Sequence, residues 1–207
     1  HGREAVIVNP PALPLTESEL DWIHELPFTR QAHPSYAPRR IPALEVVKNS
    51  VQILRGCFGG CAFCSLAAHQ GRVIQSRSKQ SVLREVRELA GQEGFSGTIT
   101  DLGGPTANMY SMGCSRPDMA AKCRRRSCLH PKICKLLRTD HHPLLELMRA
   151  VREVPGVRHV FVASGVRMDL ALQCKQYIRE LARHHTGGLL KVAPEHCDPQ
   201  VLELMHK

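Results

Sequence analysis

Hydrophobic residues recur along the chain with two alternating periods, and this pattern predicts the fold. Four short runs rich in β-branched and other apolar residues are typical of strands, at residues 50–54, 97–102, 159–163 and 188–193. Stretches with apolar residues at helical spacing separate and follow them, at residues 81–94, 143–154, 170–185 and 199–206. Because strands alternate with helices, we expect an α/β fold whose βα units form a parallel sheet.

Polar residues at the helix starts predict how these helices begin. Thr16, followed three residues later by Glu19, predicts a capping box at the start of a further helix over residues 16–26. We expect Ser81 to cap the helix over residues 81–94. Asp198 is expected to cap the last helix. These caps mark the helix boundaries independently of the hydrophobic pattern.

The composition is that of a globular protein, with 207 residues and 43% apolar residues. No apolar run approaches the roughly 20 residues that a membrane-spanning helix needs, and no signal-peptide pattern opens the chain. We therefore expect a cytoplasmic location and no membrane partner. The chain begins with His rather than Met and stops within a helical pattern, so we expect a piece of a longer protein.

Three regions differ in composition. Residues 1–48 are proline-rich and irregular, and we interpret them as an N-terminal extension. Residues 49–207 carry the βα alternation and are expected to form the core. Residues 105–139 interrupt the alternation, and we predict that they form an inserted, cysteine-rich subdomain.

A group of three cysteines follows the first predicted strand. Cys57, Cys61 and Cys64 have the spacing C-x3-C-x2-C, and thiolates are soft ligands suited to iron–sulfur clusters or zinc. A 4Fe–4S cluster takes four ligands, so three cysteines leave one iron open to an outside ligand. The alternative is a zinc site completed by Cys174, Cys197 or a histidine.

The cysteine spacing and its surroundings resemble a known family. The strings RGCFGGCAFCSLAAHQGR, QSRSKQSV, TDLGGPTANMY and ASGVRMDL are similar to the YgiQ-type family of uncharacterised radical S-adenosylmethionine (SAM) proteins. The resemblance implies a partial (βα) radical SAM barrel in which Cys57, Cys61 and Cys64 each bind one iron of a 4Fe–4S cluster. SAM would bind the fourth iron and be cleaved reductively to start radical chemistry on an unknown substrate. A flavodoxin- or ferredoxin-like protein would supply the electron.

Residues at the later strand ends are candidates for binding SAM. The resemblance places Phe63 against the adenine, and Gly103-Gly104 resembles the Gly-Gly-Glu motif that meets the SAM amino group. Proline replaces the glutamate here, and Asp101 is a possible substitute.

Three further residues follow the third and fourth strands. Ser164 could meet the ribose and Arg167 a carboxylate such as that of SAM, with Asp169 expected as a helix cap. Glu195 could contact SAM or substrate, or pair with Lys191. All these side chains are expected at one edge of the sheet, because the carboxyl ends of parallel strands meet there.

A second group of four cysteines lies within residues 105–139. Cys114, Cys123, Cys128 and Cys134 stand in a polar stretch that is too short of apolar residues to build its own core. A metal would hold such a stretch together, and the four thiols suit either zinc or a second 4Fe–4S cluster. Four reduced cysteines in a loop are the remaining alternative.

The formal charge of +9 is concentrated near the second cysteine group. Residues 116–138 hold eight Lys and Arg against one acidic residue, an excess of +7. Metal-bound thiolates could balance part of this charge. The alternative function is a zinc-binding, nucleic-acid-associated module, although an aromatic content of 4% offers few platforms for stacking bases.

Overall fold

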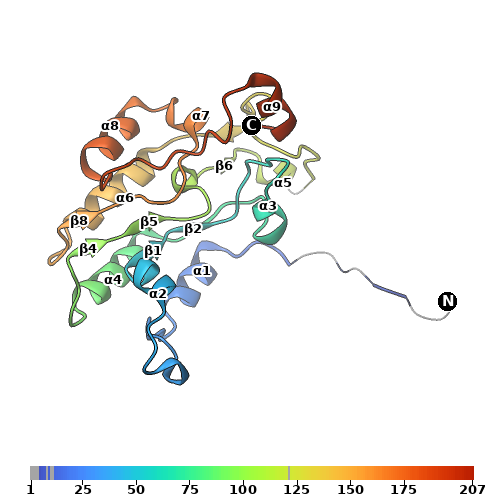
Figure 1. Ribbon diagram of the computed structural model, residues 1–207. Helices are drawn as coiled ribbons and strands as arrows, with labels where there is room; N and C mark the ends of the chain where they lie inside the picture. Colours follow the sequence, from blue (N-terminus) through green and yellow to red (C-terminus); the bar gives the residue numbers. More distant parts are fainter. Residues whose placement is uncertain (1–4, 8, 10–11, 121) are drawn as a thin grey trace.

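The computed structural model describes residues 5–7, 9, 12–120 and 122–207 (Figure 1). Its N-terminal part contains helix α1 (Glu17–His24), the short 3-10 helix η1 (Pro34–Tyr36) and helix α2 (Pro42–Val47). The capping box predicted at α1 is confirmed, because the Thr16 side chain accepts from the Glu19 N–H and the Glu19 carboxylate accepts from the Thr16 N–H. No helix in these ranges is long and apolar enough to cross a membrane.

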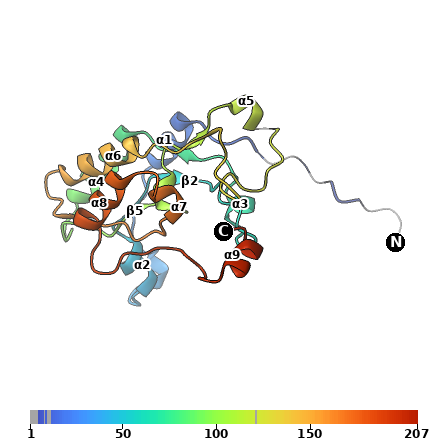
Figure 2. The same ribbon diagram turned by 90° about the horizontal axis from the view of Figure 1, so that it is seen from above.

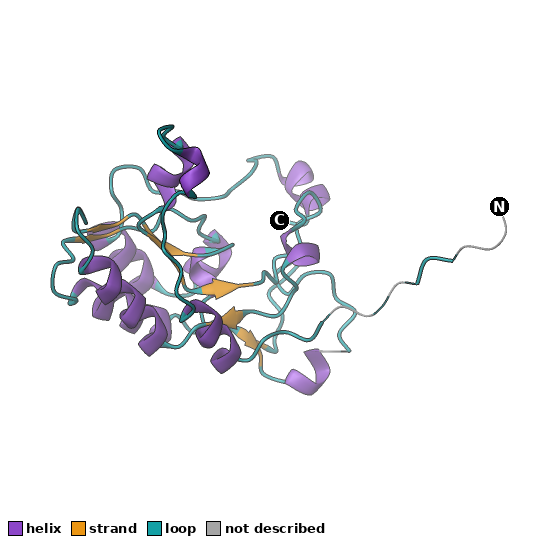
Figure 3. Ribbon diagram, turned by 90° about the horizontal axis from the view of Figure 1, so that it is seen from below, coloured by secondary structure: helices purple, strands orange, loops and turns teal. Residues whose placement is uncertain are grey.

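Parallel strand pairs join three segments that follow one another along the chain. Strand β1 (Ser50–Gln52) pairs in parallel with β5 (Asp101–Gly103). Strand β4 (Thr98–Ile99), which directly precedes β5, pairs in parallel with β8 (His159–Val160). The α/β class with parallel strands is therefore confirmed. Figure 3 shows these short strands in the middle of the molecule with helices around them.

The fourth predicted strand, residues 188–193, is wrong. A single parallel bridge between Val166 and Val192 is the pairing that this stretch makes within the described residues. The side chain of Leu189, in the middle of this stretch, is 96% exposed, so it does not pack against a neighbouring layer as an inward-facing strand residue would. The third strand is also shorter than predicted, because the N–H of Val162 donates to the carbonyl of His185 rather than to a neighbouring strand (2.9 Å).

Two antiparallel strand pairs flank the segments that carry the two cysteine groups. Strand β2 (Leu54–Arg55) pairs with β3 (Gln75–Ser76), on either side of helix α3 (Leu66–His69). Strand β6 (Gly113–Cys114) pairs with β7 (Leu137–Arg138). The β6–β7 pair encloses the stretch with the second cysteine group, including the short helix α5 (Pro117–Ala120), and follows the 3-10 helix η2 (Ala107–Met109).

Helices α4 (Lys79–Ala90) and α6 (His142–Arg152) pack against each other and supply much of the core. The expected cap at Ser81 is wrong, because Ser78 has the extended backbone of an N-cap and its side chain accepts from the Ser81 N–H (3.1 Å). The Ser81 hydroxyl instead accepts from the guanidinium of Arg77, which is only 1% exposed. The serine that the sequence pattern assigned to the helix cap thus forms hydrogen bonds with a buried cation instead.

The predicted helix over residues 170–185 is two helices. Helix α7 (Met168–Ala171) ends before Cys174, and α8 (Lys175–His184) starts after it. The expected cap at Asp169 is also wrong, since Arg167 occupies the cap position and Asp169 lies inside α7. The last helix, α9 (Pro199–Met205), begins as predicted, with the Asp198 carboxylate accepting from the N–H groups of Gln200 and Val201.

The elements separate into two sides. In Figure 1, α4, α6 and α8 lie with β4 and β8 on the left, whereas α3, α5, β6 and α9 gather on the right. The view from above in Figure 2 likewise shows α4, α6 and α8 together, apart from α3 and α9. The loop that follows β2 runs into this second side and carries the first cysteine group.

Candidate functional site

The first cysteine group lies in residues 57–64, which we name the cysteine loop. The loop directly follows β2, and its ends are tied to other segments by backbone hydrogen bonds. The N–H of Cys57 donates to Gly71 O (3.1 Å), and the N–H of Ala62 donates to Met205 O at the end of α9 (2.9 Å). Gly56 makes the turn into the loop at φ +88°, where a side chain would collide with the Val73 carbonyl. The backbone therefore sets the loop's position.

The inner face of the cysteine loop is open beside two of its thiols. A Cβ placed on Gly59 would lie 3.3 Å from Cys57 Sγ and 3.8 Å from Cys61 Sγ, so the glycine leaves this space free. Thr106 Oγ1 lies 3.6 Å from Cys57 Sγ. Two soft sulfur donors, those of Cys57 and Cys61, thus face the same space as the guanidinium of Arg167, whose Nη1 would lie 3.6 Å from that Cβ. Thiolates of this kind suit an iron–sulfur cluster, in which each binds a different iron.

Arg167 is tied to the cysteine loop by a hydrogen bond to sulfur. Its Nη1 donates to Cys61 Sγ (3.3 Å), and its guanidinium also grips the Asp169 carboxylate (2.7 to 3.2 Å). Burial alone would lower the pKa of Arg167, but Asp169 and the Cys61 thiol raise it. The side chain of Asn108, fully buried, bonds both the N–H and the carbonyl of Arg167 (2.8 and 2.9 Å). The guanidinium is thus held in place beside the thiol.

The ends of the second and third strands meet at an acidic side chain. The Asp101 carboxylate accepts from the N–H groups of Ala163 and Ser164 (2.8 and 3.0 Å) and from the Ser164 hydroxyl. Gly103 lies against this pair, and a Cβ there would collide with the Ser164 side chain. A Cβ on Gly104 would lie 2.9 Å from the Leu54 carbonyl. The structure therefore brings Asp101, Gly103 and Ser164 together at one edge of the sheet.

Two predicted site residues lie on the surface. The ring of Phe63 is 54% exposed. Glu195 has a left-handed backbone conformation, with φ of 66°. Its carboxylate pairs with Lys207 Nζ (3.0 Å), so the considered pairing with Lys191 is wrong.

The second cysteine group is arranged differently from the first. Cys114 lies in β6, and the N–H of Cys134 donates to the Cys128 carbonyl (2.8 Å). Burial raises the pKa of the Cys128 thiol, whereas the Arg125 backbone N–H lowers that of Cys123. In the described part of the chain, no three His, Cys, Asp or Glu side chains lie where they could share one metal ion. The same holds for Cys57, Cys61 and Cys64, so a metal in either cysteine group stays a prediction.

The second group nevertheless packs directly on the cysteine loop. The Cys128 N–H donates to the Phe58 carbonyl (3.0 Å), and the Ser127 hydroxyl donates to the Gly59 carbonyl. A Cβ on Gly60 would collide with the Arg126 carbonyl, so the two backbones touch there. The two cysteine groups, which the sequence separates by 50 residues, therefore form one connected region.

The sequence analysis missed three residues of this region: Thr106 and Arg72, which contact cysteines, and Asn108, which holds the backbone of Arg167. Thr106 and Asn108 follow the Gly-Gly-Pro segment directly, and polar residues after a strand end were the signal that could have identified them. Arg72 Nη1 donates to the carbonyl of Cys123 (3.3 Å). Its charge adds to the Arg125 backbone N–H in lowering the pKa of the Cys123 thiol, and it opposes the burial that raises the pKa of the Cys128 thiol. Nothing in the local sequence around Arg72 points to a partner 51 residues away.

Comparison with known proteins adds the family. The family described as "Radical SAM superfamily" matches residues 51–207, and "Radical SAM N-terminal" matches residues 1–50. The chain belongs to the radical SAM superfamily. Similar relatives include a UPF0313 protein of Vibrio vulnificus, 52% identical over 208 residues. UPF0313 proteins of Bradyrhizobium diazoefficiens and Shewanella oneidensis are 51% and 50% identical over the same length.

These relatives are much longer than the chain. Each alignment covers 100% of this chain but only 27%, 31% and 26% of the three relatives in turn. The chain thus spans about a quarter to a third of the length of the curated relatives that it matches. The matches agree with a YgiQ-type radical SAM family of unknown substrate, and they give no support to the zinc-binding, nucleic-acid-associated alternative.

Proposed function

We propose that this chain carries the cluster-binding part of a radical SAM enzyme, with Cys57, Cys61 and Cys64 as the ligands of a 4Fe–4S cluster. The observation that carries the proposal is the cysteine loop itself, which follows β2 and in which the thiols of Cys57 and Cys61 face the side of Gly59 that bears no side chain. When bound, such a cluster with SAM on its fourth iron supplies the electron that cleaves SAM into methionine and a 5′-deoxyadenosyl radical. The substrate is not assigned.

The residues around the loop have distinct proposed roles. Arg167 and Thr106 interact with cluster thiolates, because they lie 3.3 and 3.6 Å from the sulfurs of Cys61 and Cys57. Since Arg167 already grips Asp169, its role toward the SAM carboxylate becomes secondary in this proposal. Asn108 fixes the Arg167 backbone and so sets the direction of its side chain.

SAM is proposed to bind along the strand ends next to the loop. The carbonyls of Gly103 and Gly104 would accept from its ammonium group, where the absence of side chains allows close approach. Asp101 and Ser164 already bond each other, so they would meet the ribose as a pair. Phe63 would cover the adenine and Glu195 would face SAM or substrate, both from the surface.

The larger arrangement is also proposed rather than observed. The parallel segments would form a partial (βα) barrel spanning residues 49–207, preceded by the extension at residues 1–48. Residues 105–139 would be the cysteine-rich insertion, with a second 4Fe–4S cluster or zinc bound by its four cysteines. Packing of Cys128 against Phe58 supports a shared role for both cysteine groups, because a metal in one would rest on the loop of the other.

The proposal is tested by anaerobic reconstitution followed by iron, sulfide and zinc analysis. The wild-type chain is expected to lose about four irons per chain when Cys57, Cys61 and Cys64 are all replaced by alanine. The matched control replaces Cys174 and Cys197, which belong to neither group, and should keep all the iron. Zinc as the only metal, bound equally by the wild type and the triple variant, would refute the proposal.

A further inference from the structure

The surface formed by residues 116–138, which we name the basic segment, presents most of its cations to solvent. Arg116 pairs with Asp118, and the guanidinium of Arg125 is bonded to backbone carbonyls of its own segment. The other six cationic side chains are exposed: those of Lys122, Arg124, Arg126, Lys132, Lys135 and Arg138. The segment therefore combines a formal excess of +7 with charges that a partner can reach.

The basic segment lies on the outer face of the cysteine loop. Two adjacent glycines of that loop face opposite ways: Gly59 faces the thiols and Arg167, whereas Gly60 faces the carbonyl of Arg126. The Ser127 hydroxyl and the Cys128 N–H bond the loop's carbonyls from the same outer side. The backbone of the cysteine loop thus separates the basic segment from the proposed cluster. A partner bound to the basic segment would leave the strand ends, where SAM is proposed to bind, uncovered.

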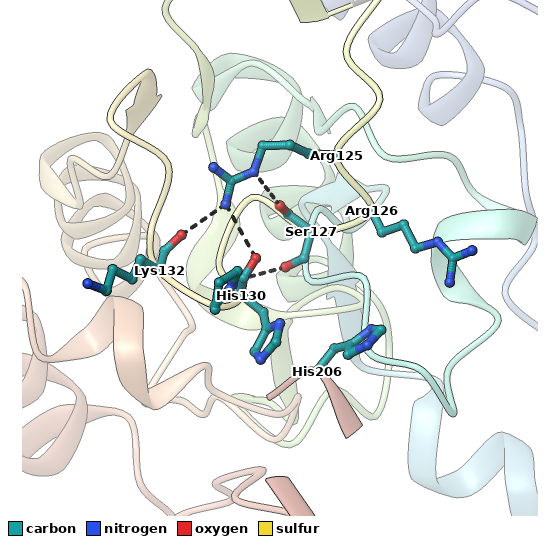
Figure 4. A pocket seen from close by; sticks show the side chains of 7 residues that line it. Arg125, Arg126, Ser127, His130, Lys132 and His206 are labelled. Carbon is teal, nitrogen blue, oxygen red and sulfur yellow. Dashed lines mark hydrogen bonds between the residues drawn. The ribbon is translucent and has the colours of Figure 1, made fainter. Parts of the chain in front are cut away.

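A hollow of about 380 Å³ marks the centre of this surface (Figure 4). Arg125 lines the hollow, and its guanidinium donates to the carbonyls of Ser127, His130 and Lys132 (3.1 to 3.3 Å). The side chains of Arg126 and Lys132 extend on opposite sides of it in Figure 4. At its base, the His130 ring stacks on His206 with centroids 5.1 Å apart, next to the end of α9. The hollow offers a cationic rim to carboxylates on a protruding partner surface.

We propose that the basic segment is the docking surface for an acidic protein that donates single electrons to the cluster. This inference rests on the proposed function, because it requires the cluster behind the loop. In the transfer, one electron leaves a reduced flavin or iron–sulfur centre of the donor and reduces the cluster by one electron, without bond formation or breakage. A nucleic acid would fit the charge as well, but residues 116–138 contain no Phe, Tyr or Trp on which bases could stack.

The test compares two reductants on the reconstituted protein. A variant with Arg124→Glu, Arg126→Glu and Lys132→Glu removes exposed cations but leaves Arg125 and both cysteine groups intact. Reduction of its cluster by reduced flavodoxin, an acidic FMN protein, is expected to slow at least about tenfold at low salt. Reduction by dithionite, a small reductant that needs no docking, should stay within about twofold of wild type. Added salt should slow the wild-type reaction with flavodoxin.

The control reverses three exposed arginines on the opposite side, Arg87 in α4 and Arg179 and Arg183 in α8. It has the same change in net charge and should react with flavodoxin at nearly the wild-type rate. Equal rates for the Arg124/Arg126/Lys132 variant and wild type would overturn the docking surface alone. Binding of an oligoribonucleotide to the basic segment without any effect on flavodoxin would also overturn it. A wild-type protein without iron would instead refute the proposed function.

Discussion

The helical side and the cysteine-bearing side of this protein are held together by different forces. On the helical side, apolar residues of α4, α6 and α8 pack against β1, β4, β5 and β8, and many of them are completely buried. On the cysteine-bearing side, the loop and the basic segment meet through hydrogen bonds to the carbonyls of Phe58 and Gly59 and through one close backbone contact at Gly60. The first region stabilises itself through burial, whereas the second contributes a few buried side chains, those of Phe58, Leu129 and Leu137, to the same core. The thiols of Cys57, Cys128 and Cys134 pack against these apolar residues.

Because of this difference, we expect substitutions on the helical side to change stability and substitutions of the cysteines to change metal binding. The helical side can be altered without touching a proposed ligand, and removal of the proposed cluster would remove no buried apolar side chain. The fold can therefore tolerate irregular, thiol-rich backbone at the strand ends, where enzymes of parallel α/β architecture concentrate their chemistry. Changes on each side should have distinct effects.

Loss of the first cysteine group is expected to have the largest effect. Replacing Cys57, Cys61 and Cys64 by alanine should abolish 5′-deoxyadenosine formation from SAM, because no open iron remains to bind it. Far-ultraviolet circular dichroism should show nearly unchanged helix content, since the hydrogen bonds of these thiols go to Thr106, Gly59 and Arg167, which lie outside α4, α6 and α8. A variant that still cleaves SAM at the wild-type rate would contradict the division of roles.

Truncation in the core is expected to act on stability alone. Leu147→Ala in α6 removes a side chain with no exposure and should lower the free energy of unfolding by about 3 kcal/mol. Leu204→Ala in α9 is the matched control, because that side chain is 78% exposed and its loss should change the free energy by less than about 0.5 kcal/mol. Urea denaturation measures both, and iron content per folded chain should stay the same.

The contact between the cysteine loop and the basic segment can be tested at Gly60. Gly60→Ala places a Cβ against the Arg126 carbonyl in a residue with φ of 64°, and we expect a loss of more than about 2 kcal/mol. Gly71→Ala has a similar φ of 86° but open space around the Cβ, so it should lose only about 1 kcal/mol. Equal losses in urea denaturation would mean that the backbone contact at Arg126 contributes nothing.

The smallest predicted effect, when counted per unit of pH, is a pH dependence of the free energy of unfolding on the helical side. The ring of His185 is fully buried, with Nδ1 bonded to the Val160 carbonyl (2.8 Å), and burial lowers its pKa from 6.5 to about 4. Below pH 6.5 the unfolded chain binds a proton that the folded chain does not, so stability should fall toward pH 4. The slope from this residue is at most about 1 kcal/mol per pH unit.

His185→Gln should remove this part of the slope between pH 6.5 and 4. The neighbouring His184→Gln is the control, because His184 is exposed and its replacement should leave the slope as in wild type. Denaturation curves measured at several pH values give the comparison. An unchanged slope in His185→Gln would show that other groups determine the pH dependence.

The sequence predicted the local features and missed the distant contacts. The parallel strands and the spacing of Cys57, Cys61 and Cys64 were readable because each lies within a short stretch with a regular pattern. The Ser81 cap was wrong because Arg77, buried by tertiary packing, bonds that hydroxyl. The bond from Arg167 to Cys61 joins residues 106 positions apart, and no local pattern encodes such a contact.

The direct test of the central claim is electron paramagnetic resonance of the dithionite-reduced, reconstituted protein with and without SAM. If three cysteines hold the cluster and leave one iron open, SAM should change the signal by binding that iron, and Cys57→Ala/Cys61→Ala/Cys64→Ala should have no signal that responds to SAM. A signal that SAM leaves unchanged in the wild type, or an equal response in the triple variant, would contradict a radical SAM centre at the cysteine loop.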